Sequence, residues 1–191
     1  MPAPNPAALD FMLARRSRPA KTLSGPGPDR ATLETILTAA ARTPDHGKLE
    51  PWRFVVIGPE AGARLARLTE TRGAAKGLDP EKIAKDASAF TRAPVCIAVL
   101  ASPVASPKIP ELEQTLSAGA VCLAAVNAAL ASGWGANWLT SWMAFDREWL
   151  SEGLEAAEHE WCAGFIHVGT ETVAPPERPR PDLAAKTTWW A

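Results

Sequence analysis

The amino-acid sequence predicts an α+β fold for a chain of 191 residues, which we expect to form a single domain with a C-terminal extended arm over residues 171–191. Two observations support this class. Several segments carry helical periodicity, while strand-like apolar runs are few and widely separated. A doubly wound sheet would instead show strands and helices alternating regularly along the chain.

Helix signals recur along much of the chain. Asn5 and Asp29 each precede an apolar stripe with helical spacing, and both residue types cap helix N-termini. The longest helix is expected over about 111–132, and its second half is apolar nearly all round. Such a helix belongs inside the protein or in a subunit interface. Shorter helices are expected over about 60–72, over 80–91 and from Phe145 onward.

Three runs have the length and composition of strands: Phe54–Ile57, Val95–Leu100 and Trp161–Val168. The second is continuously apolar, which is typical of a strand buried on both faces. Residues 136–140 fit either a short strand or an ordered loop. The proline-rich segment 175–181 must be extended, because prolines lack a backbone donor and restrict the residues before them.

Composition excludes several classes of function. Hydrophobic residues make up 47% and charged residues 21%, which is typical of a globular protein, and the formal net charge of -1 gives no field that favours nucleic acid. The N-terminus does not resemble a secretory signal, and the longest near-apolar run, 118–131, is too short to span a bilayer. We therefore expect no nucleic-acid and no membrane partner.

The three cysteines are isolated from one another and set in apolar surroundings, at positions Cys96, Cys122 and Cys162. An odd number of such residues is typical of buried, reduced thiols, so we expect a cytoplasmic protein. Neither the cysteines nor the three histidines have the short spacing of a zinc site. The chain also lacks the G-x-S-x-G motif of nucleophile-elbow hydrolases. We therefore expect no metal.

A polar loop within residues 40–54 is the first candidate for a functional site. It lies between a predicted helix and a predicted strand, and it carries Arg42, Asp45 and His46 between rigid elements. Loops held in this way concentrate binding and catalytic groups. Considered alone, the loop allows a general base or a metal ligand at His46.

Two motifs taken together suggest a family: Arg15-Arg16-Ser17 after the first helix, and Arg42-Thr43-Pro44-Asp45-His46 followed by Pro51-Trp52-Arg53-Phe54 after the second. This combination resembles the FMN-dependent nitroreductase family, in particular its branch of small bacterial NAD(P)H nitroreductases. The resemblance extends along nearly the whole chain. It continues through Arg92–Val95, Ser117–Gly119, Gly135–Trp138 and Gly164–Thr170.

The resemblance implies a central, mainly antiparallel sheet flanked by helices, in an intertwined homodimer with two FMN sites at the interface. The apolar helix would then lie in the dimer interface, and the proline-rich arm would embrace the partner subunit. The implied partners are a second copy of the chain and a small-molecule electron acceptor.

The resemblance also implies the cofactor-binding residues. The first motif would hold the FMN phosphate, ribityl chain and pyrimidine edge, and two residues of the polar loop would contact the flavin of the other subunit. Three further residues fall where close relatives carry Trp-Arg-Ser near the flavin. The full set is Arg15, Arg16, Ser17, Arg42, His46, Trp138, Leu139 and Thr140. No catalytic side chain and no metal ligand are implied.

Two positions depart from the family pattern. Leu139 replaces a cation, and Pro19 stands where other branches place a basic residue beside the flavin N1 and C2 carbonyl. Arg18 or Lys21 could compensate for the lost charge near N1. Two cations of the arm, Arg178 and Arg180, could supplement the phosphate site.

The function implied by the resemblance is ping-pong hydride transfer from NADH or NADPH through FMN to a nitroaromatic, quinone or similar oxidant. A rival hypothesis is a non-catalytic FMN-binding carrier or sensor, motivated by Leu139 and Pro19. A second rival is a related enzyme that uses the reduced flavin for oxygen chemistry or dehalogenation.

Overall fold

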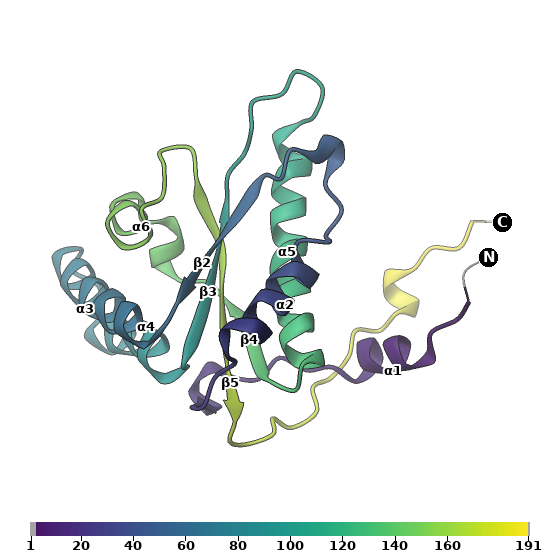
Figure 1. Cartoon of the computed structure of the whole chain (residues 1–191), viewed down its shortest axis with the longest axis horizontal. Coiled ribbons are helices and arrows are strands. Elements are labelled where there is room, and N and C mark those ends of the chain that lie inside the picture. Colours follow the sequence, from purple (N-terminus) through teal and green to yellow (C-terminus); the bar gives the residue numbers. More distant parts are fainter. Residues whose placement is uncertain (1–2, 191) are drawn as a thin grey trace.

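A computed structural model of the protein describes residues 3–190, and in that range the chain forms a five-stranded antiparallel sheet (Figure 1). The central strand β5 lies between β3 and β4, β2 is paired with β3, and β1 is paired with the end of β5. The α+β prediction is confirmed. The strands are β1 (Leu23–Ser24), β2 (Trp52–Ile57), β3 (Val95–Ala101), β4 (Gly135–Leu139) and β5 (Trp161–Glu171).

The described part of the chain contains six α-helices, at the places that the sequence pattern predicts. The predicted caps are present: Asn5 Oδ1 accepts from the Ala8 N–H, and Asp29 Oδ1 accepts from the Thr32 N–H. The helices are α1 (Pro6–Ala14), α2 (Arg30–Ala40), α3 (Pro59–Ala75), α4 (Pro80–Arg92), α5 (Glu111–Ala131) and α6 (Arg147–Leu154).

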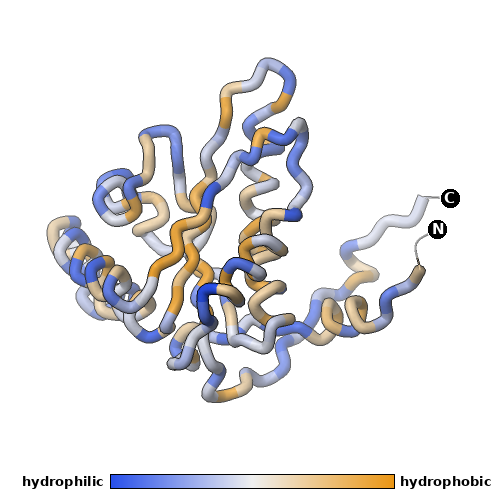
Figure 2. The backbone as a smooth tube through the Cα atoms, viewed as in Figure 1, coloured by the Kyte–Doolittle hydropathy of each residue, from blue (hydrophilic) through white to orange (hydrophobic). Residues whose placement is uncertain are grey.

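The sheet is covered on both faces. Helices α2 and α5 cover one face, and α3, α4 and α6 cover the other (Figure 1). Side chains of β3 alternate between the two resulting cores, with Ile97 and Val99 on the α5 side and Cys96 and Ala98 on the α4 side. All seven residues of β3 are buried, which explains its continuous apolar sequence; the central strands are the most apolar part of the tube in Figure 2.

Helix α5 is longer than the near-apolar run 118–131, which we expected to be too short to span a bilayer. Its 21 residues, with a mean hydropathy of 1.4 in the most apolar window, are long and apolar enough to cross a bilayer by length and composition. The helix nevertheless packs on the sheet: Ala118, Val121, Cys122 and Ala125 belong to the core. A core helix has the same composition as a span when it is buried on one side and apolar on the other.

The two ends of the chain project from the body of the molecule on the same side (Figure 1). No residue of α1 is buried, and its apolar residues Leu9, Met12 and Leu13 are exposed. Strand β5 extends to Glu171, and the predicted arm follows it. In the arm, Trp189 and Trp190 are both more than 90% exposed. These apolar surfaces remain exposed among residues 3–190.

Candidate functional site

The linker between α1 and β1 carries the first motif and is fixed to the edge strand β4. The Arg18 N–H donates to the Ala136 carbonyl at 2.8 Å. The Asn137 Nδ2 donates to the Arg18 carbonyl at 2.6 Å. These two bonds, to the N–H and to the carbonyl of the same residue, place Arg15, Arg16 and Ser17 beside the sheet edge.

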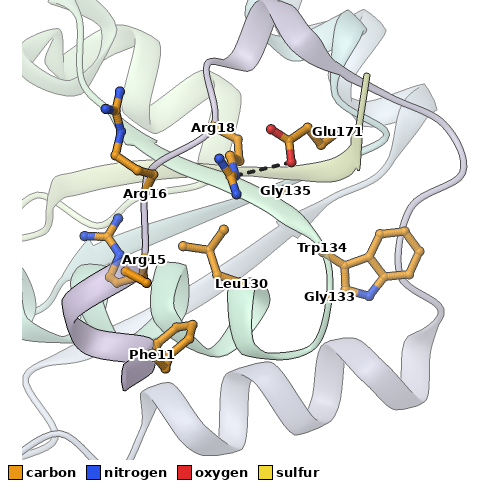
Figure 3. A pocket seen from close by; sticks show the side chains of 10 residues that line it. Phe11, Arg15, Arg16, Arg18, Leu130, Gly133, Trp134, Gly135 and Glu171 are labelled. Atoms are coloured by element: carbon orange, nitrogen blue, oxygen red, sulfur yellow. Dashed lines mark ion pairs between the residues drawn. The ribbon is translucent and has the colours of Figure 1, made fainter. Parts of the chain in front are cut away.

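On one side of this linker lies a cavity of about 370 Å³, which we call the arginine pocket. Arg15, Arg16 and Arg18 line it together with Trp134 (Figure 3). Arg18 is turned toward Glu171, with Nε 3.3 Å from Oε2, and the two are joined by the dashed line in Figure 3. Arg15 forms no ion pair within 4.0 Å in residues 3–190, and the nearest Arg16 pairing, with Glu177, is at 4.0 Å.

The electrostatics of the arginine pocket favour an anion. Burial lowers the pKa of Arg15, and the charges of Arg180, Arg16 and Arg18 lower it further. The Arg15 Nε and Arg16 Nη1 atoms are buried and have no hydrogen-bond acceptor within the described residues. Unsatisfied guanidinium donors gathered in this way match the oxygens of a phosphate group.

On the other side lies a larger cavity of about 750 Å³ between β4, α4 and the linker, which we call the β4 pocket. Its volume lies in the range of small-molecule sites. Ser17, Trp138 and Leu139 line it. The Trp138 indole donates to the Ala163 carbonyl at 3.1 Å, and a Cβ at Gly164 would collide with this ring, so the glycine allows the indole to lie on β5. Arg15 Nη2 donates to Ser17 Oγ at 3.1 Å and thereby links the two pockets.

The β4 pocket is positively charged. Its lining includes Asp86, whose carboxylate accepts from Ser141 Oγ at 2.7 Å. The cations that line it are Lys21, Lys85, Arg92 and Arg178, and none of them forms an ion pair within 4.0 Å in the part of the chain that the structure describes.

Arg18 and Lys21, the two candidates for the positive charge that Pro19 does not provide, lie in different pockets. Arg18 lines the arginine pocket and pairs with Glu171, whereas Lys21 lines the β4 pocket. Sequence reasoning missed Lys85 and Arg92. They are seven residues apart on α4 and therefore share a helix face, but nothing in the sequence says that this face meets β4.

The polar loop forms a third site, elsewhere on the molecule. His46 Nδ1 lies 2.6 Å from Glu113 Oε2 of α5. The loop is held further by Ser117 Oγ, which donates to the Pro44 carbonyl at 2.9 Å, and by Asp45 Oδ2, which accepts from the Glu50 N–H at 2.6 Å. These contacts fix the imidazole at the surface beside the first half of α5.

One chain therefore brings together only part of the predicted cofactor site. Arg15, Arg16 and Ser17 lie with Trp138 and Leu139 around the two linked pockets, and Thr140 lines a neighbouring depression that shares Leu139. Arg42 and His46 line neither pocket. The His46 partner Glu113 is 17 residues from Leu130 of the arginine pocket, or about 25 Å along α5.

Within residues 3–190 no group of three His, Cys, Asp or Glu side chains lies close enough together to hold a metal ion. His167 of β5 is almost fully buried, and burial lowers its pKa to about 4, so the imidazole is neutral near pH 7. The three cysteines are free and buried, as predicted.

The arginine pocket and the apolar-walled β4 pocket lie side by side at the edge of an antiparallel α+β sheet, an arrangement that is complementary to a phosphorylated small molecule. The model of the nitroreductase family matches residues 13–170. The chain belongs to the nitroreductase family, as its sequence motifs indicate.

Two curated relatives cover most of the chain. The protein named "Putative NAD(P)H nitroreductase YdjA" of Escherichia coli (strain K12) is 35% identical over 163 residues, which are 85% of this chain and 87% of that protein. The "Putative NAD(P)H nitroreductase" of Haemophilus influenzae is 34% identical over 166 residues, covering 85% of this chain and 88% of that protein.

Solved structures show the same fold at lower identity. A nitroreductase-like family protein from Bacillus cereus aligns with a TM-score of 0.78 at 20% identity, covering 100% of this chain and 98% of the other. A "putative nitroreductase in complex with FMN" from Desulfovibrio desulfuricans aligns with a TM-score of 0.75 at 20% identity, covering 99% of each chain. The antiparallel sheet flanked by helices is thus the family's fold.

Proposed function

We propose that the protein is an FMN-dependent oxidoreductase that transfers hydride from NADH or NADPH through FMN to a nitroaromatic, quinone or similar oxidant in a ping-pong cycle. The observation that carries the proposal is the pairing of the arginine pocket with the β4 pocket on one linker. Together they offer a phosphate site next to an apolar-walled cavity that suits a flat ring. The names of the two curated relatives and the FMN complex of the Desulfovibrio protein support it.

The residues present fit FMN. The unsatisfied donors of Arg15 and Arg16 suit the phosphate, and Arg180 of the arm adds charge close enough to Arg15 to lower its pKa. Ser17 would contact the flavin end, because it lines the β4 pocket, and Trp138 and Leu139 would form the wall against the ring. When bound, FMN supplies the hydride chemistry, while the chain binds, orients and electrostatically stabilises it.

The cations of the β4 pocket would favour the anionic reduced form of the ring. Lys21, Lys85 and Arg92 surround the cavity without carboxylate partners within 4.0 Å in residues 3–190, so their charge is directed to the ligand. On this proposal, Lys21 and the cations of helix α4 supply the positive charge that Pro19 and Leu139 do not provide. No side-chain general acid is required, because solvent can supply protons to the oxidant.

A homodimer would complete the site. An outward stripe of α5, formed by Leu112, Leu116 and Leu123, is 46–67% exposed, and the apolar side of α1 and the two terminal tryptophans are exposed as well. Apolar surface of this extent marks an interaction site. A second copy seated on α5 would bring its own Arg42 and His46 toward the first copy's flavin. The buried free thiols agree with a cytoplasmic, reducing location.

The experiment that tests the function is anaerobic mixing of the FMN-loaded protein with NADH or NADPH, followed by a nitroaromatic. We expect rapid bleaching of the flavin near 450 nm by one of the two nucleotides and recovery of the colour with the oxidant. A yellow protein that neither nucleotide bleaches would instead be the carrier or sensor. Reduction followed by oxygenated or dehalogenated products in air would identify the third class.

A further inference from the structure

The His46 imidazole and the Glu113 carboxylate form a close pair outside the two pockets. His46 Nδ1 lies 2.6 Å from Glu113 Oε2, and this contact joins the polar loop to the first turn of α5. The two side chains are 62% and 46% exposed, so more than half of the imidazole is open to its surroundings. An exposed pair of this kind contributes little to the stability of a fold, so its main effect is on the imidazole itself.

The backbone around His46 is constrained independently of Glu113. Gly47, Lys48 and Glu50 have φ angles of 75°, 55° and 48°, in the left-handed region that residues other than glycine rarely adopt. The hydrogen bonds that hold this loop to α5 and across its own turn are made by other side chains. Left-handed residues persist where surrounding contacts hold them, and they gather at functional sites. The loop thus fixes the position of His46, and the contact with Glu113 fixes its ring.

The contact with Glu113 determines which ring nitrogen of His46 carries the proton. An ionised carboxylate only accepts hydrogen bonds, so Nδ1 must be the protonated nitrogen and must donate to Glu113. In a neutral ring the lone pair then lies on Nε2, on the side of the ring away from Glu113. Free histidine in water favours the opposite form, with the proton on Nε2. Glu113 therefore changes what His46 offers to a ligand, from a hydrogen-bond donor to an acceptor.

The pair lies on the surface that the proposed homodimer would turn toward the second flavin. His46 and Glu113 line a depression of about 500 Å³ together with Leu116, which belongs to the exposed stripe of α5. An acceptor on this surface is complementary to a hydroxyl group, and the ribityl chain of FMN carries several. A lone pair that is already in place when the ligand arrives lowers the cost of binding.

We propose that Glu113 is a positioning residue that holds His46 in the Nδ1–H form, so that Nε2 is ready to accept a hydrogen bond from a hydroxyl group of the FMN bound by the other subunit. The identity of the ligand rests on the proposed function and its homodimer. The effect of Glu113 on the ring is a property of one chain, and it can be measured without FMN.

Nuclear magnetic resonance of isotope-labelled imidazole nitrogens in the full-length protein tests the tautomer directly. The chain has three histidines, so the signals that disappear in His46→Ala identify His46. Above the pH range of its titration, wild-type His46 should show a protonated Nδ1 and an unprotonated Nε2 before FMN is added. Glu113→Ala should show mainly the opposite form. Addition of FMN to the wild-type protein should shift the Nε2 signal and leave the tautomer unchanged.

The affinity for FMN tests whether Glu113 acts through His46. Glu113→Ala should weaken FMN binding by about two- to tenfold, the cost of drawing on a less populated tautomer. In a His46→Ala background the same substitution should change the affinity by less than about twofold, because the ring through which it acts is gone. A residue with a purely structural role would weaken binding equally in both backgrounds.

The matched control is Glu111→Ala. Glu111 is exposed in the same first turn of α5, but it is two residues from Glu113 and therefore does not share its helix face. Its substitution should leave both the tautomer of His46 and the affinity for FMN unchanged.

Several results would overturn the proposal. They are a wild-type His46 with its proton on Nε2, a tautomer that Glu113→Ala does not change, an equal effect of Glu113→Ala in both backgrounds, and an Nε2 signal that does not move when FMN binds. A wild-type chain that binds no FMN would refute the proposed function itself, while the tautomer measured without FMN would still decide the effect of Glu113 on the ring.

Discussion

Arg15 stands at the junction of the two pockets, where it lines one and hydrogen-bonds the Ser17 hydroxyl that lines the other. Its guanidinium is partly buried among other cations and has no carboxylate within 4.0 Å in the described residues. Such an arrangement raises the free energy of the empty site, and a bound phosphate dianion relieves it.

We therefore expect Arg15→Ala to weaken FMN binding by about 10- to 100-fold, the effect of losing one or two charge-assisted hydrogen bonds. Binding of riboflavin, which lacks the phosphate, should change by less than about threefold. Flavin fluorescence quenching measures both affinities. The matched control is Arg30→Ala, because Arg30 is exposed on α2 and forms an exposed pair with Glu34 of the same helix. Equal losses for FMN and riboflavin would place Arg15 at the ring and not at the phosphate.

At this scale the sequence could identify Arg15, Arg16 and Ser17, because they follow one another in a recognisable motif. It could not identify Lys85 or Arg92 of the pocket. Each becomes part of the pocket only when α4 packs beside β4, and that packing depends on residues far apart in the chain.

At the scale of elements, the register of the sheet decides which side chains meet. Strand β2 and the turn before β5 are joined by Arg53, whose Nε and Nη2 donate to the two carboxylate oxygens of Glu160 at 2.7 and 2.8 Å. Glu160 Oε2 also accepts from the Ala157 N–H at 2.9 Å. The Glu160 side chain is 5% exposed, so the carboxylate of this ion pair is buried.

The hydrogen bonds from Arg53 lower the pKa of Glu160 to about 2. Because this value lies below the ordinary 4.5, the pair contributes its full stability above about pH 5 and loses it as the pH falls toward 2. We expect Glu160→Gln to lower the free energy of unfolding by about 1–3 kcal/mol at pH 7, and the difference from wild type to shrink steadily below about pH 4.5.

Urea unfolding at a series of pH values measures this difference. Glu34→Gln is the control, since Glu34 forms an exposed pair with Arg30 and its loss should cost less than about 1 kcal/mol. A Glu160→Gln difference that stays constant between pH 7 and pH 3 would contradict the assignment of the pKa shift to this pair.

Periodicity predicted the helices and the three longer strands because each carries its own pattern of apolar residues. It did not predict β1, which has two residues and exists only through its pairing with the end of β5. Nor could it show that Leu112, Leu116 and Leu123 face away from the sheet, because an apolar residue has the same signature in a core and in an interface.

At the scale of the whole molecule, the two halves of the predicted flavin site lie at different places on one chain. The linker with Arg15 lies near the end of α5, and the loop with His46 lies beside its beginning. The proposed homodimer resolves this separation, because each site would take its linker from one subunit and its loop from the other.

Mixed dimers test this arrangement. Arg15→Ala and His46→Ala chains, each of which should bind FMN weakly alone, are unfolded together and refolded. In a mixed dimer both substitutions fall in one of the two sites, and the other site is intact. Each mixed dimer should therefore bind about half as much FMN as a wild-type dimer. Mixing Arg15→Ala with Arg16→Ala is the control, because both residues lie on the linker and no intact site can form. If the refolded mixture of Arg15→Ala and His46→Ala chains bound no more FMN than either variant alone, a site shared between subunits would be contradicted.

The most direct test of the central claim is the stoichiometry of FMN binding to the purified protein. If the arginine pocket and the β4 pocket form one cofactor site, equilibrium titration should saturate at one FMN per chain, with two per dimer by sedimentation, and the complex should be yellow. A colourless protein that binds no added FMN would contradict the account.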